Sequence, residues 1–304
     1  MRANSPHKGV PLSSNRKPLS AVLFLFFLLL LTSPAFAAKV LIIGDTQYAM
    51  VADIVSEIQV SLRSQSKEYA TSEIRGKLGT VVEREDARIV VALGMEAVNE
   101  ALRLPSSISV VYGLVVAPPK SGRTNVTGVY MSPPVSEYVA TIRRYLPALG
   151  KVAAVGSPGM MKSLIGGDTA QVSVHTVSSS SELVNTVNHI SDSRALLLLP
   201  DANLLTTQVM SNVLLHSFKK NIPLLGISEA TVKQGALFAL VFDHKTVSRQ
   251  IGEKVQSILN GVDAEEIPAS PPRKYNLYIN SNTAQKMGIS IPDEMAKKAK
   301  KIYQ

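Results

Sequence analysis

The chain has 304 residues, 45% of them hydrophobic, and its 32 basic and 23 acidic side chains give a formal net charge of +9. It contains no cysteine, which excludes disulfides and cysteine-based catalysis and predicts that no lipid anchor is attached through cysteine. A chain of this length is long enough to fold as two modest domains through burial of apolar side chains alone.

The first 37 residues have the pattern of a secretory signal peptide. Four basic residues precede an apolar run at residues 21–31, and Ala35-Phe36-Ala37 fits a cleavage site. We predict cleavage before Ala38, export to the periplasm and no transmembrane segment in the mature chain. The alternative is an uncleaved membrane anchor, but the apolar run is shorter than the roughly 20 residues that span a bilayer.

Apolar runs alternate with helical patterns from residue 39 to residue 112. We predict strands at 40–43, 67–71, 88–93 and 108–112. Helices are predicted at 49–62, at 72–83 with interruptions at Gly76 and Gly79, and from Met95 onward. Repeated β-α-β units with short links are typical of a parallel, doubly wound sheet. The Gly44-Asp45-Thr46 turn lacks the spacing of a nucleotide-binding motif, so we interpret it as a structural turn.

Three features at the ends of these strands are candidate ligand contacts. Asp45 follows the first strand. Met95 and Glu96 begin a helix whose free N–H groups could hold an anion. Tyr112 ends the last of these strands, where it could supply an aromatic wall or be a partly buried core residue.

A second set of strands and helices follows a Pro/Gly-rich loop at 118–122. We place the first crossing between two lobes at 131–134 and the third at the proline-rich residues 268–272. Strands are predicted at 152–155, 171–177, 195–199, 223–227, 237–242 and 275–279. Helices are predicted at 136–145, 182–190, 204–219, 246–259, 283–287 and 292–301.

Polar residues follow three neighbouring strands of this second set. Asp201, Ser228 and Asp243 each come directly after an apolar run. Ligands of open parallel sheets bind outside the carboxyl ends of the strands, so we expect these side chains along one edge of one sheet. Asp201 could contact a ligand ammonium, or it or Asn203 could cap the next helix. The same two interpretations, contact with a ligand or capping of the next helix, apply to Ser228 with Glu229 and to Asp243.

Several sequence blocks occur in an order that resembles a known family. They are T-N-V-T-G-V at 124–129, P-D-A-N at 200–203, I-P-L-L-G-I-S-E at 222–229, V-K-Q-G-A-L at 232–237, F-D at 242–243, G-E-K-V-Q-S-I-L-N-G at 252–261 and Y-I-N-S-N-T-A-Q-K-M-G-I-S-I-P at 278–292. Together they resemble periplasmic substrate-binding proteins of ABC importers, which include tryptophan- and tyrosine-binding members.

This resemblance implies a fold and a function. It implies an α/β, type I periplasmic binding protein with two Rossmann-like lobes, parallel sheets and a multi-crossing hinge. Residues 38–131 with about 245–268 would form one lobe, and 132–244 with about 269–304 the other. Such a protein captures a small molecule as a monomer and delivers it to an inner-membrane ABC permease. It has no cofactor and no catalytic residues.

The chain departs from the family pattern at several expected ligand contacts. Met95 and Glu96 stand where relatives tend to carry a small hydroxyl residue, and the segment Tyr112-Gly113-Leu114-Val115 stands where they often have Thr and Asp. The relatives' N-P-x-E-x-N-S turn is S-P-G-M-M-K-S here, which keeps Ser163 as a contact candidate beside Ser157 but loses the Glu. These departures predict a ligand that is more apolar than an aromatic amino acid, or cationic.

Two other functions stay open from the residues alone. The same fold could serve as a periplasmic receptor or interaction module for a sensor or another transport system. Enzyme activity is less favoured, because the histidines lack metal-ligand spacing and no hydrolase motif occurs, although His244 beside Asp243 could handle protons. The sequence contains no basic stripe interleaved with aromatic residues, so nucleic-acid binding is not predicted. No metal site is expected either.

Overall fold

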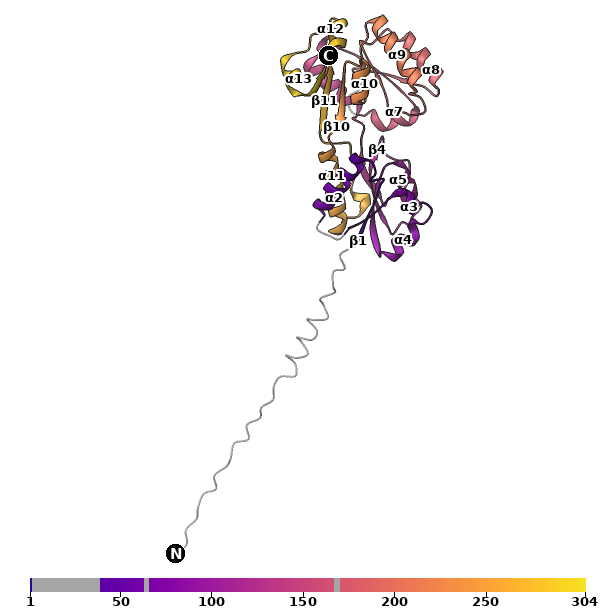
Figure 1. Ribbon diagram of the computed structural model, residues 1–304, viewed down its shortest axis with the longest axis vertical. Coiled ribbons are helices and arrows are strands. Elements are labelled where there is room, and N and C mark those ends of the chain that lie inside the picture. The colour runs from indigo at the N-terminus through magenta and orange to yellow at the C-terminus, as the bar shows by residue number, and fades with distance from the viewer. Residues whose placement is uncertain (2–38, 63–65, 167–169) are drawn as a thin grey trace. The chain divides into compact units, whose positions relative to one another are not determined.

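The computed structural model describes Met1 and residues 39–62, 66–166 and 170–304 (Figure 1). Residues 38–304 form one compact unit. The predicted signal peptide lies outside the described residues, apart from Met1. Across the described ranges, every helix is too short or too polar to cross a membrane.

The first sheet is parallel, with the strand order β2-β1-β3-β4-β5. Its strands and the helices between them are β1 (Lys39–Ile43), α2 (Ala49–Ser61), β2 (Ser66–Tyr69), α3 (Thr71–Ile74), α4 (Leu78–Arg84), β3 (Ala87–Leu93), α5 (Met95–Ala101), β4 (Ser109–Val115) and β5 (Val126–Tyr130). The central strands are apolar runs because side chains on both faces are covered: Val90 and Val91 point to opposite faces, and both are fully buried.

One helix predicted for this part of the chain is two helices. The helix predicted at 72–83, with interruptions at Gly76 and Gly79, is broken once: α3 ends at Ile74 and α4 begins at Leu78, while Gly79 lies within α4. Gly76 lies in the turn between them with φ +69°, a left-handed conformation that glycine adopts without steric cost.

A helix from the later part of the sequence covers the first sheet. This helix, α11 (His244–Leu259), packs against α2, β4 and β5, and Figure 1 shows α2 and α11 together. Val247, Ile251 and Val255 form its fully buried stripe. Gly113 of β4 allows this close packing, because a Cβ atom there would lie only 2.5 Å from Ile251 Cδ1.

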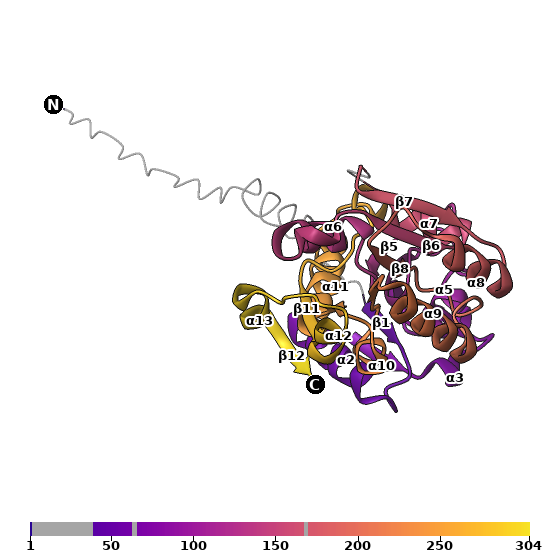
Figure 2. The ribbon, with the colours of Figure 1, turned by 90° about the horizontal axis from the view of Figure 1, so that it is seen from above.

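The second sheet is also parallel, with the order β7-β6-β8-β9. Its elements are α6 (Val135–Tyr145), the 3-10 helix η1 (Pro147–Leu149), β6 (Val152–Gly156), α7 (Pro158–Leu164), β7 (Val172–Thr176), α8 (Ser180–His189), β8 (Ala195–Leu198), α9 (Thr207–Lys220), β9 (Leu224–Leu225) and α10 (Glu229–Gln234). Helices α8 and α9 pack against each other, as Figure 2 shows.

The prediction that the strands before Asp201, Ser228 and Asp243 share one sheet is wrong, because β10 (Phe238–Phe242) pairs with later strands in a third sheet. This sheet adjoins the second through a bridge between Gly226 and Ala239. It contains β10 (Phe238–Phe242), β11 (Tyr275–Asn280) and β12 (Ala299–Tyr303), and its other elements are the 3-10 helix η2 (Ala264–Glu266), α12 (Ser281–Lys286) and α13 (Asp293–Lys298). Strand β11 runs antiparallel to β10 and parallel to β12.

The end of the chain differs from the prediction. The last helix was expected over 292–301, but α13 ends at Lys298 and the following residues form β12. The helix prediction is wrong here because Ala299–Tyr303 pair with the open edge of β11, with Asn280 opposite Tyr303. The Tyr303 hydroxyl also donates to Glu229, which ties the strand to α10.

Candidate functional site

A pocket of about 790 Å³ lies at the carboxyl ends of strands from the first and second sheets. It is lined by residues of α5, by the end of β4 and the loop after it, by the β6–α7 turn and by the segment after β8: Met95, Asn99, Leu102, Leu114–Lys120, Ser157–Met160, Ser163 and Pro200–Asn203. Its volume falls within the roughly 300–1,000 Å³ of small-molecule sites. Its position is the one that parallel sheets favour for ligands.

Asp201 is held in a fixed orientation in this pocket. Its Oδ2 atom accepts a hydrogen bond from Ser157 Oγ at 2.6 Å, and its Oδ1 atom accepts one from the backbone N–H of Asn203 at 3.0 Å. A carboxylate oxygen can accept two hydrogen bonds, so each atom keeps capacity for another donor. The side chain is therefore oriented and still able to bind a ligand ammonium or hydroxyl group.

Helix capping does not account for Asp201. Helix α9 begins at Thr207, and its N-cap is Thr206, whose Oγ1 accepts from the N–H of Val209 at 3.3 Å. The prediction that Asp201 or Asn203 caps the next helix is therefore wrong, because the turn after β8 is longer than the sequence pattern suggested.

Lys120 is a charged residue of the pocket that sequence reasoning missed. Its exposed side chain lies over the turn at Gly159, where an added Cβ atom would come within 3.0 Å of Nζ. Arg123 holds this loop in place by donating to the carbonyl oxygens of Leu102 at 2.5 Å and Leu104 at 2.7 Å. The sequence does place this basic residue soon after the end of a strand, which could have marked it as a ligand contact. The surrounding prolines and glycine indicated only a linker.

Three residues predicted from the first sheet do not line this pocket. Asp45 accepts a hydrogen bond from the N–H of Thr71 at 3.1 Å and so joins the end of β1 to α3. Glu96 forms an ion pair with Arg75 on the protein surface. Tyr112 is 2% exposed and packs in the core, where burial raises the pKa of its hydroxyl. Met95, in contrast, is 51% exposed and borders the pocket.

Ser228 and Glu229 are engaged in local structure around α10. Ser228 is its N-cap, and its Oγ accepts from the N–H of Thr231 at 3.2 Å. Glu229 pairs with Lys233 at 3.1 Å and accepts from the Tyr303 hydroxyl. Ser228 borders a separate, smaller pocket rather than the one that contains Asp201.

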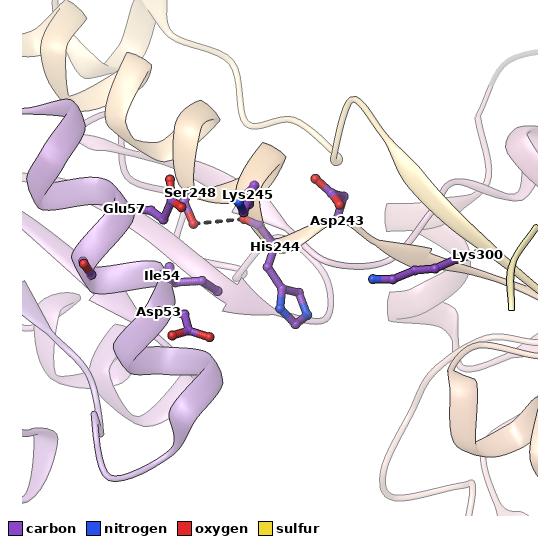
Figure 3. Close-up of a pocket in the computed structure, with 9 residues that line it drawn as sticks. Asp53, Ile54, Glu57, Asp243, His244, Lys245, Ser248 and Lys300 are labelled. Carbon is purple, nitrogen blue, oxygen red and sulfur yellow. Dashed lines mark hydrogen bonds between the residues drawn. The ribbon is translucent and has the colours of Figure 1, made fainter.

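Asp243 is the N-cap of α11 and borders a third pocket, of about 450 Å³, with Asp53, His244 and Lys300 (Figure 3). Its Oδ2 atom accepts from the N–H of Thr246 at 3.1 Å and from the Thr246 hydroxyl at 2.8 Å. Partial burial raises the pKa of Asp243, but the hydrogen bonds from Thr246 and Asn276 and the nearby charge of Lys274 together outweigh it, so the net pKa is lowered. The Asp243 carboxylate therefore caps the first turn of α11.

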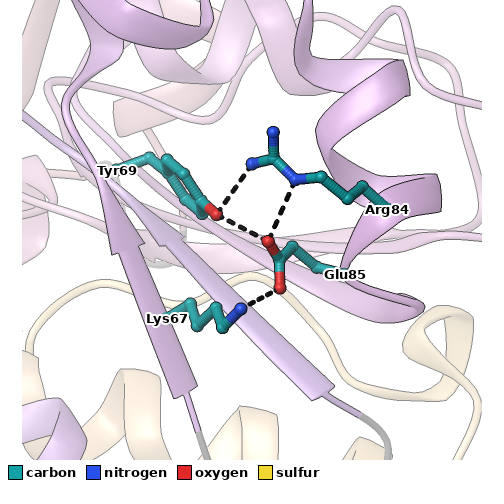
Figure 4. Close-up of polar contacts among 4 residues, drawn as sticks. All are labelled: Lys67, Tyr69, Arg84 and Glu85. Atoms are coloured by element: carbon teal, nitrogen blue, oxygen red, sulfur yellow. Dashed lines mark hydrogen bonds and ion pairs between the residues drawn. The ribbon is translucent and has the colours of Figure 1, made fainter.

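A further polar cluster lies away from the pocket (Figure 4). Glu85 accepts hydrogen bonds from Lys67, from the Tyr69 hydroxyl at 2.8 Å and from Arg84 Nε at 3.2 Å. These donors, Lys67 first, lower the pKa of Glu85 to about 2. Every group in the cluster has a protein partner, so its role is to join β2 to the end of α4.

Metal ligands do not gather in the structure. Among the described residues, no three or more His, Asp or Glu side chains are grouped so that they could hold a metal ion. The pocket around Asp201 is lined by apolar and hydrogen-bonding groups and by the charged side chain of Lys120.

Comparison with protein families identifies one family. The model of the ABC transporter substrate binding protein family matches residues 107–303. A search of curated proteins found no match.

Solved structures show the same fold at low sequence identity. One is a conserved domain protein from Vibrio cholerae, with 18% identity, 88% of this chain and 99% of that chain covered and a TM-score of 0.56. An ABC domain in complex with L-Trp from Streptococcus pneumonia has 20% identity, coverages of 87% and 99% and a TM-score of 0.52. A ligand-free, open substrate binding protein with adhesive properties from Clostridium difficile has 14% identity, coverages of 88% and 99% and a TM-score of 0.59. The expected α/β fold with parallel sheets is confirmed.

Proposed function

Since the chain belongs to the ABC transporter substrate binding protein family, as its sequence blocks predicted, we propose that it captures a small molecule for an ABC importer. The observation that carries this proposal is the pocket of about 790 Å³, in which Ser157 and the N–H of Asn203 orient the Asp201 carboxylate. The importer's inner-membrane permease would be the partner, and the protein would work as a monomer in the periplasm after cleavage before Ala38.

The pocket lining supports a ligand that is largely apolar and carries a hydrogen-bond donor. Leu102, Leu114, Val116 and Met160 offer apolar surface. Among the described residues that line the pocket, Asp201 and Lys120 are the charged ones, and Lys120 is exposed. A ligand ammonium or hydroxyl group would meet Asp201 while the rest of the molecule contacts the apolar surface.

We further propose that the pocket closes by a hinge motion. Residues 38–131 with about 245–268 would move as one lobe and 132–244 with about 269–304 as the other. Met95 and Val116 are apolar, yet they are 51% and 38% exposed at the border of the pocket. Ligand binding and closure would bury them, and the apolar surface removed from water would stabilise the closed state.

Binding without turnover fits the chemistry of the pocket. Ser157 donates to Asp201, and no histidine is among the described lining residues to act as its general base. We therefore propose that the ligand leaves the protein unchanged. Chemical conversion of a bound ligand would contradict this and favour an enzyme.

Native mass spectrometry of the protein, purified from its producing cells without refolding, tests the proposal. A stoichiometric small-molecule adduct that is lost on denaturation would support capture, and the mass of the denatured chain would show whether it begins at Ala38. A protein that carries no adduct and shows no thermal shift with amino acids, nucleosides, peptides or sugars would contradict capture. That result would favour an interaction module.

A further inference from the structure

A second pocket, of about 230 Å³, adjoins the one that contains Asp201. We call it the inner chamber. Its walls come from α6 and the ends of β8, β9 and β10, and include Tyr138, Leu197, Leu199, Ile227, Leu240 and Phe242. Val116 and Pro200 line both pockets, so the two spaces meet at these residues.

The hydroxyl groups at the inner chamber are largely engaged by the protein. Tyr138 donates its hydroxyl proton to the carbonyl oxygen of Gly226 at 2.9 Å, so it presents its ring to the chamber. Ser228 Oγ caps α10 through the N–H of Thr231. Among the described lining residues none is charged, and Ser132 is the remaining hydroxyl. The chamber therefore offers apolar surface and almost no polar partner.

The size of the chamber suits an apolar group. A protein cavity of about 150 Å³ with apolar walls stays free of water and binds benzene. The inner chamber, at about 230 Å³, is larger than that. It is also next to the candidate anchor, because Pro200 stands at the junction and the following residue is Asp201.

We propose that the ligand is an elongated amphiphile, with an ammonium group that contacts Asp201 and an apolar chain or ring that enters the inner chamber. This inference rests on the proposed function and names its substrate class. Binding strength would then have two separable sources. Asp201 sets the affinity for the polar end, and the chamber sets how affinity rises with apolar length.

A series of unbranched primary amines, from butylamine to octylamine, tests the inference by calorimetric titration of the protein freed of endogenous ligand. Each methylene that enters the chamber should tighten binding roughly fourfold, until the chamber is full. Asp201→Asn should weaken every member by a similar factor and leave the dependence on length unchanged.

Filling the chamber should remove the dependence on length. Ile227→Trp adds bulk at a half-buried wall position that lines only the inner chamber, so octylamine should bind no more tightly than butylamine. Leu240→Phe is a second filling variant in case the first does not fold. Ile302→Trp, on β12 and 42% exposed, is the matched control and should behave as the unmodified protein.

The outcomes separate the two proposals. Equal affinity for all the amines would overturn the chamber inference and leave capture by Asp201 standing. A steep dependence that survives both filling variants would also overturn the inference. Failure of every amine to bind, while native mass spectrometry finds another adduct, would overturn the amine-and-chamber assignment and leave solute capture standing. Failure of both experiments would overturn capture itself.

Discussion

Replacing Asp201 with asparagine separates a role in binding from a role in folding. Asparagine has nearly the same shape, and its side-chain oxygen can still accept from the N–H of Asn203, while its amide can donate to Ser157 Oγ. The substitution therefore removes the charge and keeps the turn. We expect the free energy of unfolding to change by less than about 1 kcal/mol, because α9 has its own cap at Thr206.

The effect on ligand binding should be much larger. A hydrogen bond to a charged group contributes about 1.5–3 kcal/mol, which corresponds to roughly a 10- to 150-fold increase in Kd when it is lost. Thr206→Ala is the matched control, because it removes the cap of α9 and leaves the pocket intact. That variant should lose about 1 kcal/mol of stability, or roughly 2–4 °C in Tm, with unchanged affinity.

Two assays on the unmodified protein, Asp201→Asn and Thr206→Ala check this reasoning. Thermal unfolding without ligand gives the change in stability, and titration with the ligand identified by native mass spectrometry gives the change in Kd. If Asp201→Asn lowered Tm by several degrees and left Kd unchanged, Asp201 would be a structural residue. The assignment of the pocket would then lose its central contact.

Four further changes test the packing and the electrostatics. Gly128→Ala should cost about 3 kcal/mol or more in urea denaturation, because its Cβ would lie 2.3 Å from the carbonyl oxygen of Tyr112. Gly79→Ala in α4, with nothing within 4 Å of the new atom, should be neutral or stabilise by up to about 1 kcal/mol. Ile251→Ala should cost about 2–5 kcal/mol, and a loss below about 1 kcal/mol would contradict its burial against the first sheet. Glu85 stabilises the fold above its ordinary pKa of 4.5 and loses that effect as the pH falls toward its folded pKa of about 2, so Glu85→Gln should make Tm less dependent on pH in this window. Equal slopes of Tm against pH for the two proteins would contradict the lowered pKa.

Sequence patterns predicted the buried strands well because burial on both faces leaves a simple signature. The run Ala195–Leu198 is apolar at every position and forms β8 in the centre of the second sheet. The end of the chain had no such signature. Lys300 and Lys301 continue the helical spacing of α13, but pairing with β11 makes this segment a strand, and that long-range contact is invisible in the local sequence.

The candidate site was predicted in part, through the rule that ligands bind at the carboxyl ends of parallel strands. That rule and the family resemblance placed Ser157, Ser163 and Asp201 in the pocket. Lys120 was missed because the position of its loop depends on Arg123 and on carbonyl oxygens about 20 residues earlier. The inner chamber was missed because it forms where strands from distant parts of the chain end together.

The three polar residues after β8, β9 and β10 explain why residue type alone could not identify the candidate ligand contact. Ser228 and Asp243 are each followed at once by a helix, so their oxygen atoms accept from the first turn of α10 and α11. Asp201 is followed by a longer turn, and Thr206 takes the capping role instead. The distance from the strand end to the first helical residue therefore decides whether a polar side chain is used by its own helix or stays available to a ligand. This distance could not be fixed from the sequence, because Asp201, Asn203 and Thr206 are all residues that cap helices well.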